Sequence, residues 1–222
     1  RDQLPAIQQH GLEVVVHSET QLRALEQEPQ LQIRRAWLKL DSGMHRLGFP
    51  TEQAAQQHAR LRRLKGIQEV ALMSHFACAD EIDHPLNQLQ IQRFDAAVAG
   101  LSGVQSFANS AALVNFPEAR RDWVRSGLML YGVSPFADRT AADLGLRPVM
   151  TLGTRILAVH QVEAGESIGY GAAFRCPEAM PVGIAAIGYG DGYPRHANNG
   201  TPVLVNGQLA HLVGRVSMDM LA

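Results

Sequence analysis

The sequence predicts an α/β fold in which a parallel sheet with crossover helices is followed by an antiparallel β domain. Short apolar runs alternate with amphipathic helical stretches over the first two-thirds of the 222-residue chain. Near residue 146 this pattern changes to short strand-like runs separated by glycine and asparagine. The composition, 46% hydrophobic and 18% charged residues, is typical of a globular protein.

The first segment, residues 1–146, is expected to contain five strands and four helices. The strands are predicted at 12–16, 36–40, 70–75, 104–108 and 128–131. The helices are predicted at 18–26, 51–64, 85–101 and 110–115, with Ser18 and Thr51 as N-caps. Repeated β-then-α units imply parallel strands joined by right-handed crossovers. They fit part of a (β/α)8 barrel or an open doubly wound sheet.

The second segment, residues 147–222, is expected to form the antiparallel β domain. Its strand-like runs occupy residues 149–162, 183–187, 202–205 and 210–213. Asn206-Gly207 separates the last two runs, and Asn-Gly accepts the positive φ angles of a type I′ turn. A hairpin is therefore predicted there.

Charge and cysteine content exclude several classes of protein. A net charge of −1 provides no basic surface for nucleic acid or for an acidic membrane. No apolar run approaches the ~20 residues that span a bilayer. Cys78 and Cys176 are too few for a disulfide scaffold or a cysteine metal site, and they fit a reducing compartment. We expect a cytoplasmic protein without a metal, and the start at Arg1, without Met or a secretory segment, suggests part of a longer protein.

Polar residues recur where the predicted strands end, which is where a parallel barrel carries its functional side chains. Taken singly, each has a structural interpretation as a buried histidine, a helix cap or an ion-pair partner. Their repetition at one edge of one sheet favours a functional site. In chain order they are Lys39, Arg46, His75, Asn109, Ser110, Arg125, Gly127 and Leu128.

Seven motifs occur in a fixed order between Lys39 and Asp219. They are Lys39-Leu-Asp-Ser-Gly-Met-His-Arg46, Ser74-His-Phe-Ala-Cys-Ala-Asp80, Asn109-Ser-Ala-Ala112, Arg125-Ser-Gly-Leu-Met-Leu-Tyr-Gly132, Ser167-Ile-Gly-Tyr-Gly171, Ile187-Gly-Tyr-Gly-Asp-Gly-Tyr193 and Gly214-Arg-Val-Ser-Met-Asp219. Together they resemble the alanine racemases, enzymes of fold type III that use pyridoxal 5′-phosphate.

The resemblance implies an isomerase that interconverts L-alanine and D-alanine by a two-base mechanism. It implies a TIM-like barrel followed by the β domain, and a homodimer with shared active sites. Such an enzyme supplies D-alanine for peptidoglycan in the cell wall or serves alanine catabolism. Alanine is the implied substrate.

The resemblance also assigns roles to residues. Tyr170 would be one base, with His75 beside it and Arg125 linked to His75 and bonded to the cofactor's ring nitrogen. The cofactor phosphate would be held by Ser110, next to Asn109, and by backbone N–H groups near Gly127 and Leu128. Arg46 would contact both the cofactor's phenolic oxygen and the substrate carboxylate. The substrate would also contact Met218, Asp219 and Tyr189, and Lys39 would be the lysine that the family often carbamylates. A lysine near a sheet end could instead pair with Asp41, and this alternative stays open.

One feature of the family is expected to be missing. Its cofactor-binding lysine comes from the first barrel strand, and neither lysine of this chain, Lys39 or Lys65, matches that place. We expect the chain to lack that segment and the family's C-terminal end, and to be neither stably folded nor catalytic by itself.

Three other functions are alternatives. A broad-specificity amino-acid or serine racemase would share the fold and the motifs. A non-catalytic homologue that binds pyridoxal phosphate would leave Tyr170 and Met218 without a role. An interaction module would be a homologue that has lost the lysine.

Overall fold

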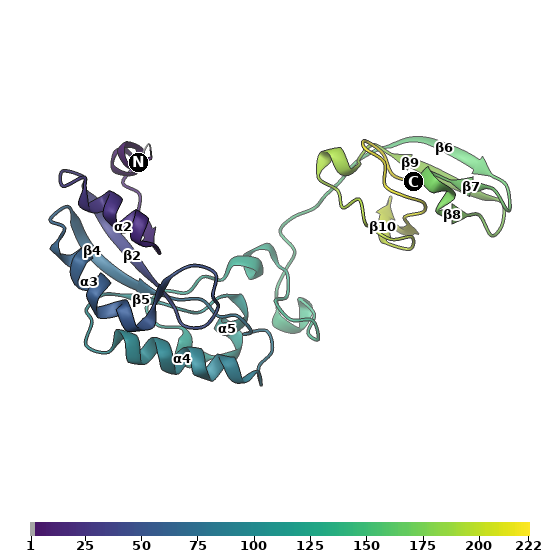
Figure 1. Ribbon diagram of the computed structural model, residues 1–222. Helices are drawn as coiled ribbons and strands as arrows, with labels where there is room; N and C mark the ends of the chain where they lie inside the picture. The colour runs from purple at the N-terminus through teal and green to yellow at the C-terminus, as the bar shows by residue number, and fades with distance from the viewer. Residues whose placement is uncertain (1–2) are drawn as a thin grey trace. The chain divides into compact units, whose positions relative to one another are not determined.

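The computed structural model describes residues 3–222, and the chain divides into two compact units, Arg1–Met150 and Thr151–Ala222 (Figure 1). The division at residue 150 lies close to residue 146, where the sequence pattern changes. We call these the barrel unit and the β unit.

Parallel strands form the sheet of the barrel unit, in the order β1-β2-β4-β5, with β3 paired to the end of β2. The strands are β1 (Val14–Val16), β2 (Ile33–Asp41), β3 (Phe49–Pro50), β4 (Ile67–Met73) and β5 (Gln105–Ser106). Because all of them are parallel, their carboxyl ends meet at one edge of the sheet.

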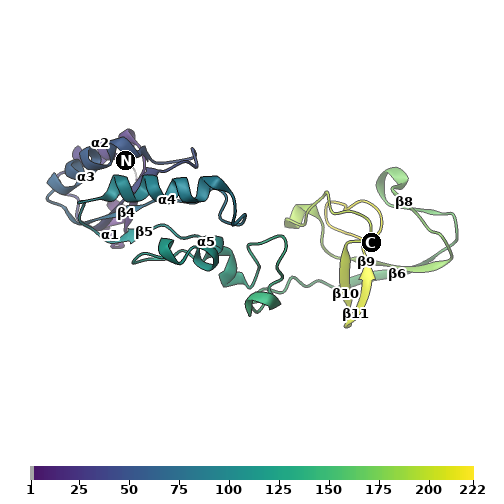
Figure 2. The ribbon, with the colours of Figure 1, turned by 90° about the horizontal axis from the view of Figure 1, so that it is seen from below.

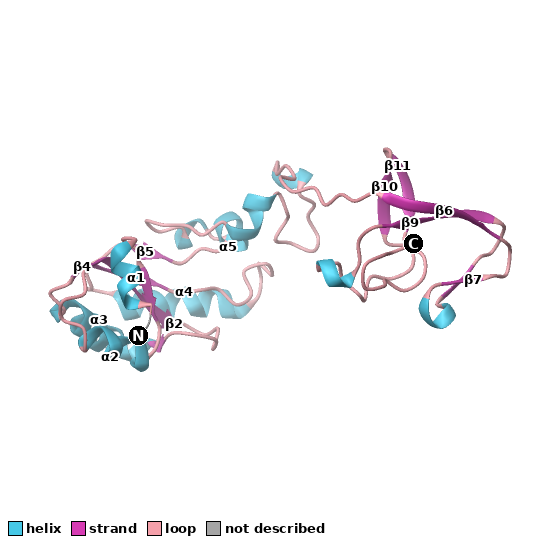
Figure 3. Cartoon of the chain, turned by 90° about the horizontal axis from the view of Figure 1, so that it is seen from above, coloured by secondary structure: helices cyan, strands magenta, loops and turns pink. Residues whose placement is uncertain are grey.

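Helices α2, α3 and α4 follow β1, β3 and β4, and they lie on one face of the sheet (Figures 2 and 3). The helices are α1 (Leu4–Gln9), α2 (Glu19–Glu26), α3 (Ala54–Arg63), α4 (Pro85–Val98) and α5 (Ser110–Asn115). The predicted cap of α2 is confirmed, since Ser18 Oγ accepts from the Gln21 N–H at 3.4 Å. The predicted Thr51 cap is wrong. Thr51 begins a 3₁₀ turn before α3, and its hydroxyl donates to Glu52 instead.

Strand β2 shows how the sequence positions polar groups on the other face. Ala36, Leu38 and Leu40 alternate along it and belong to the buried core. Lys39 lies between two of them and therefore points to the opposite face. The same face of β4 ends at Met73, which pairs with Lys39.

The core of the barrel unit lies between the sheet and these helices. Its centre is aromatic: the rings of Phe76 and Phe107 stack with centroids 4.1 Å apart, and Phe94 from α4 packs 4.8 Å from Phe107. All three side chains are at most 1% exposed. The expected α/β fold, a partial barrel followed by an antiparallel unit, is confirmed.

The fifth strand was predicted in the wrong place. Residues Gly127–Tyr131 form a 3₁₀ helix that ends at Gly132 in the left-handed region, with φ 74°. The segment that extends the sheet beyond β5 comes earlier, because Trp123 N–H donates to Gln105 O at 3.0 Å and Arg125 N–H to Ala108 O at 3.0 Å. The apolar run 128–131 has the composition of a strand, but its backbone forms a 3₁₀ helix.

The β unit consists of antiparallel pairs. These are β6 (Ile156–Val162) with β9 (Met180–Ala185), β7 (Ser167–Ile168) with β8 (Phe174–Arg175), and β10 (Pro202–Val205) with β11 (Gln208–His211). The predicted hairpin is confirmed, with φ of 50° at Asn206 and 80° at Gly207. The strand expected at 149–162 begins only at Ile156, which pairs with Ala185, the last residue of its partner β9.

Candidate active site

The guanidinium of Arg125 is the centre of a hydrogen-bond cluster at the carboxyl edge of the sheet. Nη1 donates to Ser106 Oγ at 2.6 Å, and Nη2 donates to the Ser74 carbonyl at 2.7 Å. Nη2 also lies 3.3 Å from Nδ1 of His75, the residue that follows β4 by two positions. The predicted link between His75 and Arg125 is therefore present in the geometry.

The electrostatics of this edge favour an anion. Burial, followed by the charges of Arg125, Arg46 and Lys39, lowers the pKa of His75 to about 4. Burial, Arg46 and Arg125 also lower the pKa of Lys39, against an opposing effect of Asp41. Three cations around a neutral imidazole leave positive potential that an anionic ligand would neutralise.

The loop after β2 presents Arg46 and is shaped by Asp41. Asp41 Oδ1 accepts from the N–H groups of Gly43, Met44 and His45, each at 3.0 Å. These bonds hold the pKa of the Asp41 carboxyl below its usual range although burial opposes them. Within residues 3–222 Lys39 forms no ion pair, so pairing with Asp41 is not the role that the geometry gives it.

Ser110 lies against the 3₁₀ turn that begins at Gly127. Its Oγ donates to the Ser126 carbonyl and accepts from Met129 N–H at 3.4 Å. The N–H groups of Gly127 and Leu128 open the turn, where no acceptor is available within the turn itself. A Cβ on Gly127 would stand 3.7 Å from Ser110 Oγ, so the glycine keeps space beside the hydroxyl.

Asn109 acts as the N-cap of α5. Its Oδ1 accepts from Ala112 N–H at 3.0 Å, which fixes Ser110 as the first helical residue. The structure therefore shows Asn109 as a helix cap, which is its structural interpretation.

The remaining predicted residues belong to the β unit. Tyr170 opens a 3₁₀ turn and is 69% exposed. The turn is shaped by glycines: Gly169 and Gly171 have φ of 72° and 70°, in the left-handed region that favours glycine, and both lie beside Arg215.

Met218 and Tyr189 are joined by backbone hydrogen bonds. Tyr189 N–H donates to Ser217 O at 3.0 Å, and Gly190 N–H donates to Met218 O at 2.7 Å. Met218 is 56% exposed and Tyr189 38% exposed. The segment 215–219 thus contacts both the Tyr170 turn and the Tyr189 turn, and Asp219 lies beside Gly190, whose Cβ would be 3.4 Å from Asp219 Oδ1.

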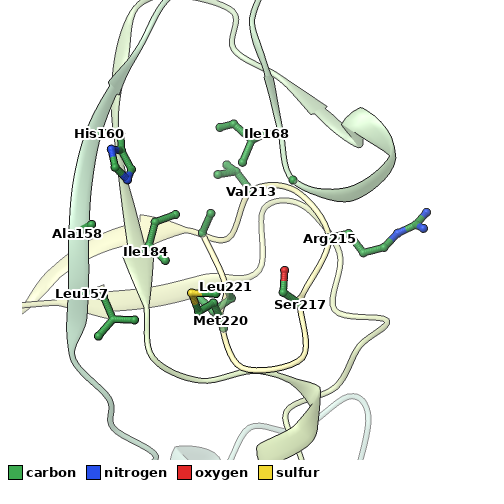
Figure 4. Close-up of a pocket in the computed structure, with 12 residues that line it drawn as sticks. Leu157, Ala158, His160, Ile168, Ile184, Val213, Arg215, Ser217, Met220 and Leu221 are labelled. Carbon is green, nitrogen blue, oxygen red and sulfur yellow. The ribbon is translucent and has the colours of Figure 1, made fainter.

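A cavity of about 420 Å³ in the β unit is lined by Gly169 and Ser217, the neighbours of Tyr170 and Met218, but not by the predicted residues themselves. Figure 4 shows it bordered by apolar side chains such as Ile168, Ile184 and Val213, with Arg215 extending away from them. It offers little hydrogen-bonding chemistry. Among residues 3–222 no three His, Cys, Asp or Glu side chains gather closely enough for a metal ion, and no helix there is long and apolar enough to cross a membrane.

Sequence reasoning missed the residues that orient Arg125. Ser106 and Ser74 are 2% and 1% exposed, and both are bonded to its guanidinium. Gln90 of α4 is also missed; it donates to the carbonyl of His75 at 3.0 Å. The sequence feature that could have identified them is a polar residue within an apolar strand end or within the buried stripe of a helix.

Comparison with known proteins gives two family matches. Residues 1–135 match the family model described as alanine racemase, N-terminal domain. Residues 149–222 match the family model described as alanine racemase, C-terminal domain. The chain is 54% identical to an alanine racemase of Nitrosococcus oceani, over 100% of this chain and 62% of the relative. It is 50% identical to one of Halorhodospira halophila, over 95% of this chain and 58% of the relative.

Solved structures agree with these matches. The biosynthetic alanine racemase of Pseudomonas aeruginosa superposes with a TM-score of 0.91 at 46% identity, covering 99% of this chain and 62% of that one. The alanine racemase of Acinetobacter baumannii gives 0.86 at 41% identity, with coverage of 99% and 62%. The chain spans about three-fifths of the length of the relatives it matches.

Proposed function

The chain belongs to the alanine racemase family, and from this premise we propose that its protein is an isomerase that interconverts L-alanine and D-alanine. The single observation that carries the proposal, beyond the family itself, is the Arg125–His75 contact of 3.3 Å at the cationic edge of the sheet. This edge is where a parallel barrel binds its ligands.

The residues at this edge fit the phosphate and the ring nitrogen of pyridoxal 5′-phosphate, the cofactor of the family. A phosphate dianion suits the Ser110 hydroxyl and the free N–H groups of the turn at Gly127 and Leu128, where the missing Cβ of Gly127 keeps space. Arg125 would donate to the ring nitrogen. When bound, the cofactor supplies an electron sink that makes the α-proton of alanine removable.

Arg125 sets the protonation of both of its neighbours. A guanidinium only donates hydrogen bonds, so Nδ1 of His75 must accept and its proton resides on Nε2. With a pKa of about 4, the imidazole is neutral at physiological pH. Toward the ring nitrogen of a bound cofactor, the same permanent donor would oppose protonation and moderate the electron demand on the substrate.

Tyr170 is the proposed base for L-alanine, acting from a second copy of the chain. A phenol has a pKa near 10, so it needs a donor to stabilise its charged form. The Nε2 proton of His75 suits that purpose. The exposure of Tyr170 and Met218, 69% and 56%, supports a homodimer in which each β unit completes the site of its partner.

Arg46 and Lys39 are proposed to serve the substrate carboxylate. Arg46 lies on the loop that Asp41 stiffens, and a guanidinium matches a carboxylate with two parallel bonds. The lowered pKa of Lys39 leaves more of its amine neutral, which is the form that carbamylation requires. A carbamate would turn this cation into an anion able to orient Arg46. Tyr189, Met218 and Asp219 would line the substrate side.

The experiment that tests this function is direct. The full-length protein, supplied with pyridoxal 5′-phosphate, is expected to convert L-alanine into D-alanine. Chiral chromatography measures the D-alanine that forms. Serine and other amino acids are tested in parallel. Racemisation of serine at a rate equal to alanine would favour the broad-specificity alternative, and bound cofactor without racemisation would favour the non-catalytic one. A D-alanine requirement for growth after deletion would support the role in the cell wall.

A further inference from the structure

A buried glutamine on α4 contacts both loops that carry the proposed site. Gln90 is 0% exposed and lies in the helix stripe that also contains Ile91 and Phe94, which pack in the core. A side-chain amide is unexpected in such a stripe unless every polar atom finds a partner. Gln90 finds three.

Its hydrogen bonds reach two separate segments. Nε2 donates to the His75 carbonyl at 3.0 Å and to Ser42 Oγ at 3.3 Å, and Oε1 accepts from Ala77 N–H at 2.9 Å. His75 belongs to the segment after β4. Ser42 belongs to the loop after β2 that presents Arg46.

Two further hydrogen bonds link Ser42 to Ser74 and Ser74 to Leu40, and the donor of each is determined. Ser74 Oγ donates its only proton to the carbonyl of Leu40 at 2.8 Å, because a carbonyl can only accept. Ser42 must therefore donate to Ser74 Oγ across their 2.9 Å contact. The serine hydroxyls are 1% exposed, so no water competes for these bonds.

The backbone around His75 is thus held from two sides. The Ser74 carbonyl before it accepts from Arg125, and its own carbonyl accepts from Gln90. Gly43 closes the packing over Gln90, since a Cβ there would stand 3.4 Å from Gln90 Cγ. Movement of the Gln90 amide would shift the His75 peptide and loosen the contact between the imidazole and Arg125.

We propose that Gln90 is a positioning residue that couples the Arg46 loop to the His75 segment and so sets the His75–Arg125 geometry. The contribution of Gln90 to catalysis rests on the proposed racemase function. The coupling of the two segments through Gln90 does not depend on that function. Glutamine suits this place because it has two donors and one acceptor at the end of a side chain long enough to span both loops. Methionine has a similar shape but no donors.

The test is titration of His75 by nuclear magnetic resonance in the cofactor-free full-length protein. The His75 signal is assigned by its loss in His75→Gln. Burial and the charges of Arg125, Arg46 and Lys39 hold the wild-type pKa at about 4. Gln90→Met is expected to raise it by about one unit or more toward the ordinary 6.5, because the imidazole gains water and leaves Arg125.

Gln57→Met is the matched control. Gln57 is a buried glutamine of α3, 4% exposed, whose amide bonds Gln53 and Arg60 rather than the site. It should leave the His75 pKa unchanged even where it lowers the melting temperature. If Gln90→Met does not fold, Gln90→Asn, an amide one methylene shorter, is expected to raise the His75 pKa as well.

Two results would overturn the proposal: a folded Gln90 variant with an unshifted His75 pKa, or an equal shift in Gln57→Met. Neither depends on enzymatic turnover. Failure of the wild-type protein to racemise alanine would count against the proposed function and leave this coupling intact.

Discussion

Nη2 of Arg125 lies 3.3 Å from Nδ1 of His75, and the same nitrogen is held by the Ser74 carbonyl at 2.7 Å. The arrangement makes the imidazole an acceptor toward Arg125. It also makes protonation of His75 costly, because a second proton would face a permanent cation in a partly buried place.

The first prediction concerns acid sensitivity. The pKa of His75 is depressed to about 4 in the folded protein, while an unfolded chain has the ordinary value near 6.5. As pH falls from 6.5 toward 4, the His75 side chain of the unfolded state binds a proton before that of the folded state does. The free energy of unfolding is therefore highest above pH 6.5 and falls through this range. Urea unfolding of the full-length protein at pH 7 and pH 5 should show a larger loss for wild type than for His75→Gln. Equal losses in both proteins would mean that His75 titrates normally.

The second prediction concerns the aromatic core under the site. Phe107 is 0% exposed and stacks on Phe76 at 4.1 Å. Phe107→Ala should lower the free energy of unfolding by about 3–5 kcal/mol. Leu89→Ala, on the exposed side of α4 at 40% exposure, is the control and should cost less than about 1 kcal/mol. Similar costs would show that the stack is not the centre of this core.

The third prediction concerns the Met218 segment. A Cβ on Gly188 would lie 2.3 Å from the Met218 carbonyl oxygen and 2.4 Å from that of Ser217, so Gly188→Ala must displace this backbone. We expect a loss of about 1–3 kcal/mol and faster hydrogen exchange at the N–H groups of Tyr189 and Gly190. Gly153→Ala, where a Cβ meets no atom within 4 Å, should leave both measurements unchanged. Undisturbed exchange in Gly188→Ala would contradict the close packing.

Much of the fold was predictable because the sequence pattern and the local geometry agree. The alternation in β2, the Ser18 cap and the Asn206-Gly207 turn each follow from the chemistry of a few neighbouring residues. The apolar run 128–131 was misassigned because hydrophobicity does not distinguish a short strand from a 3₁₀ turn. The decisive feature is the positive φ at Gly127 and Gly132, which the sequence does not reveal by itself.

The sequence predicted which residues lie near the site more readily than it predicted the hydrogen bonds between them. His75, Ser110 and Arg125 were identified from strand ends and motifs, and their proximity follows from parallel strands sharing an edge. The supporting bonds from Ser106, Ser74 and Gln90 were not predicted, because they depend on how side chains orient between segments that lie 15 to 51 residues apart in the sequence.

The fourth prediction concerns the ring nitrogen of the cofactor. Arg125→Glu replaces a permanent donor with a group that can hold a shared proton, which strengthens the electron demand of the ring. In the full-length protein racemisation should fall while transamination becomes detectable as pyruvate formed from alanine. If Arg125 only stabilises the barrel unit, the variant would instead melt earlier and release the cofactor without producing pyruvate. A melting curve beside the pyruvate assay distinguishes the two outcomes.

We propose that the chain provides one of two opposed bases through Tyr170. The most direct measurement is exchange of the α-proton of each alanine enantiomer into heavy water, using full-length Tyr170→Ala with pyridoxal 5′-phosphate. Loss of a general base typically costs about 10²–10⁴-fold in rate. We predict a loss of that size for L-alanine and a much smaller loss for D-alanine. Equal losses for the two enantiomers would contradict the account.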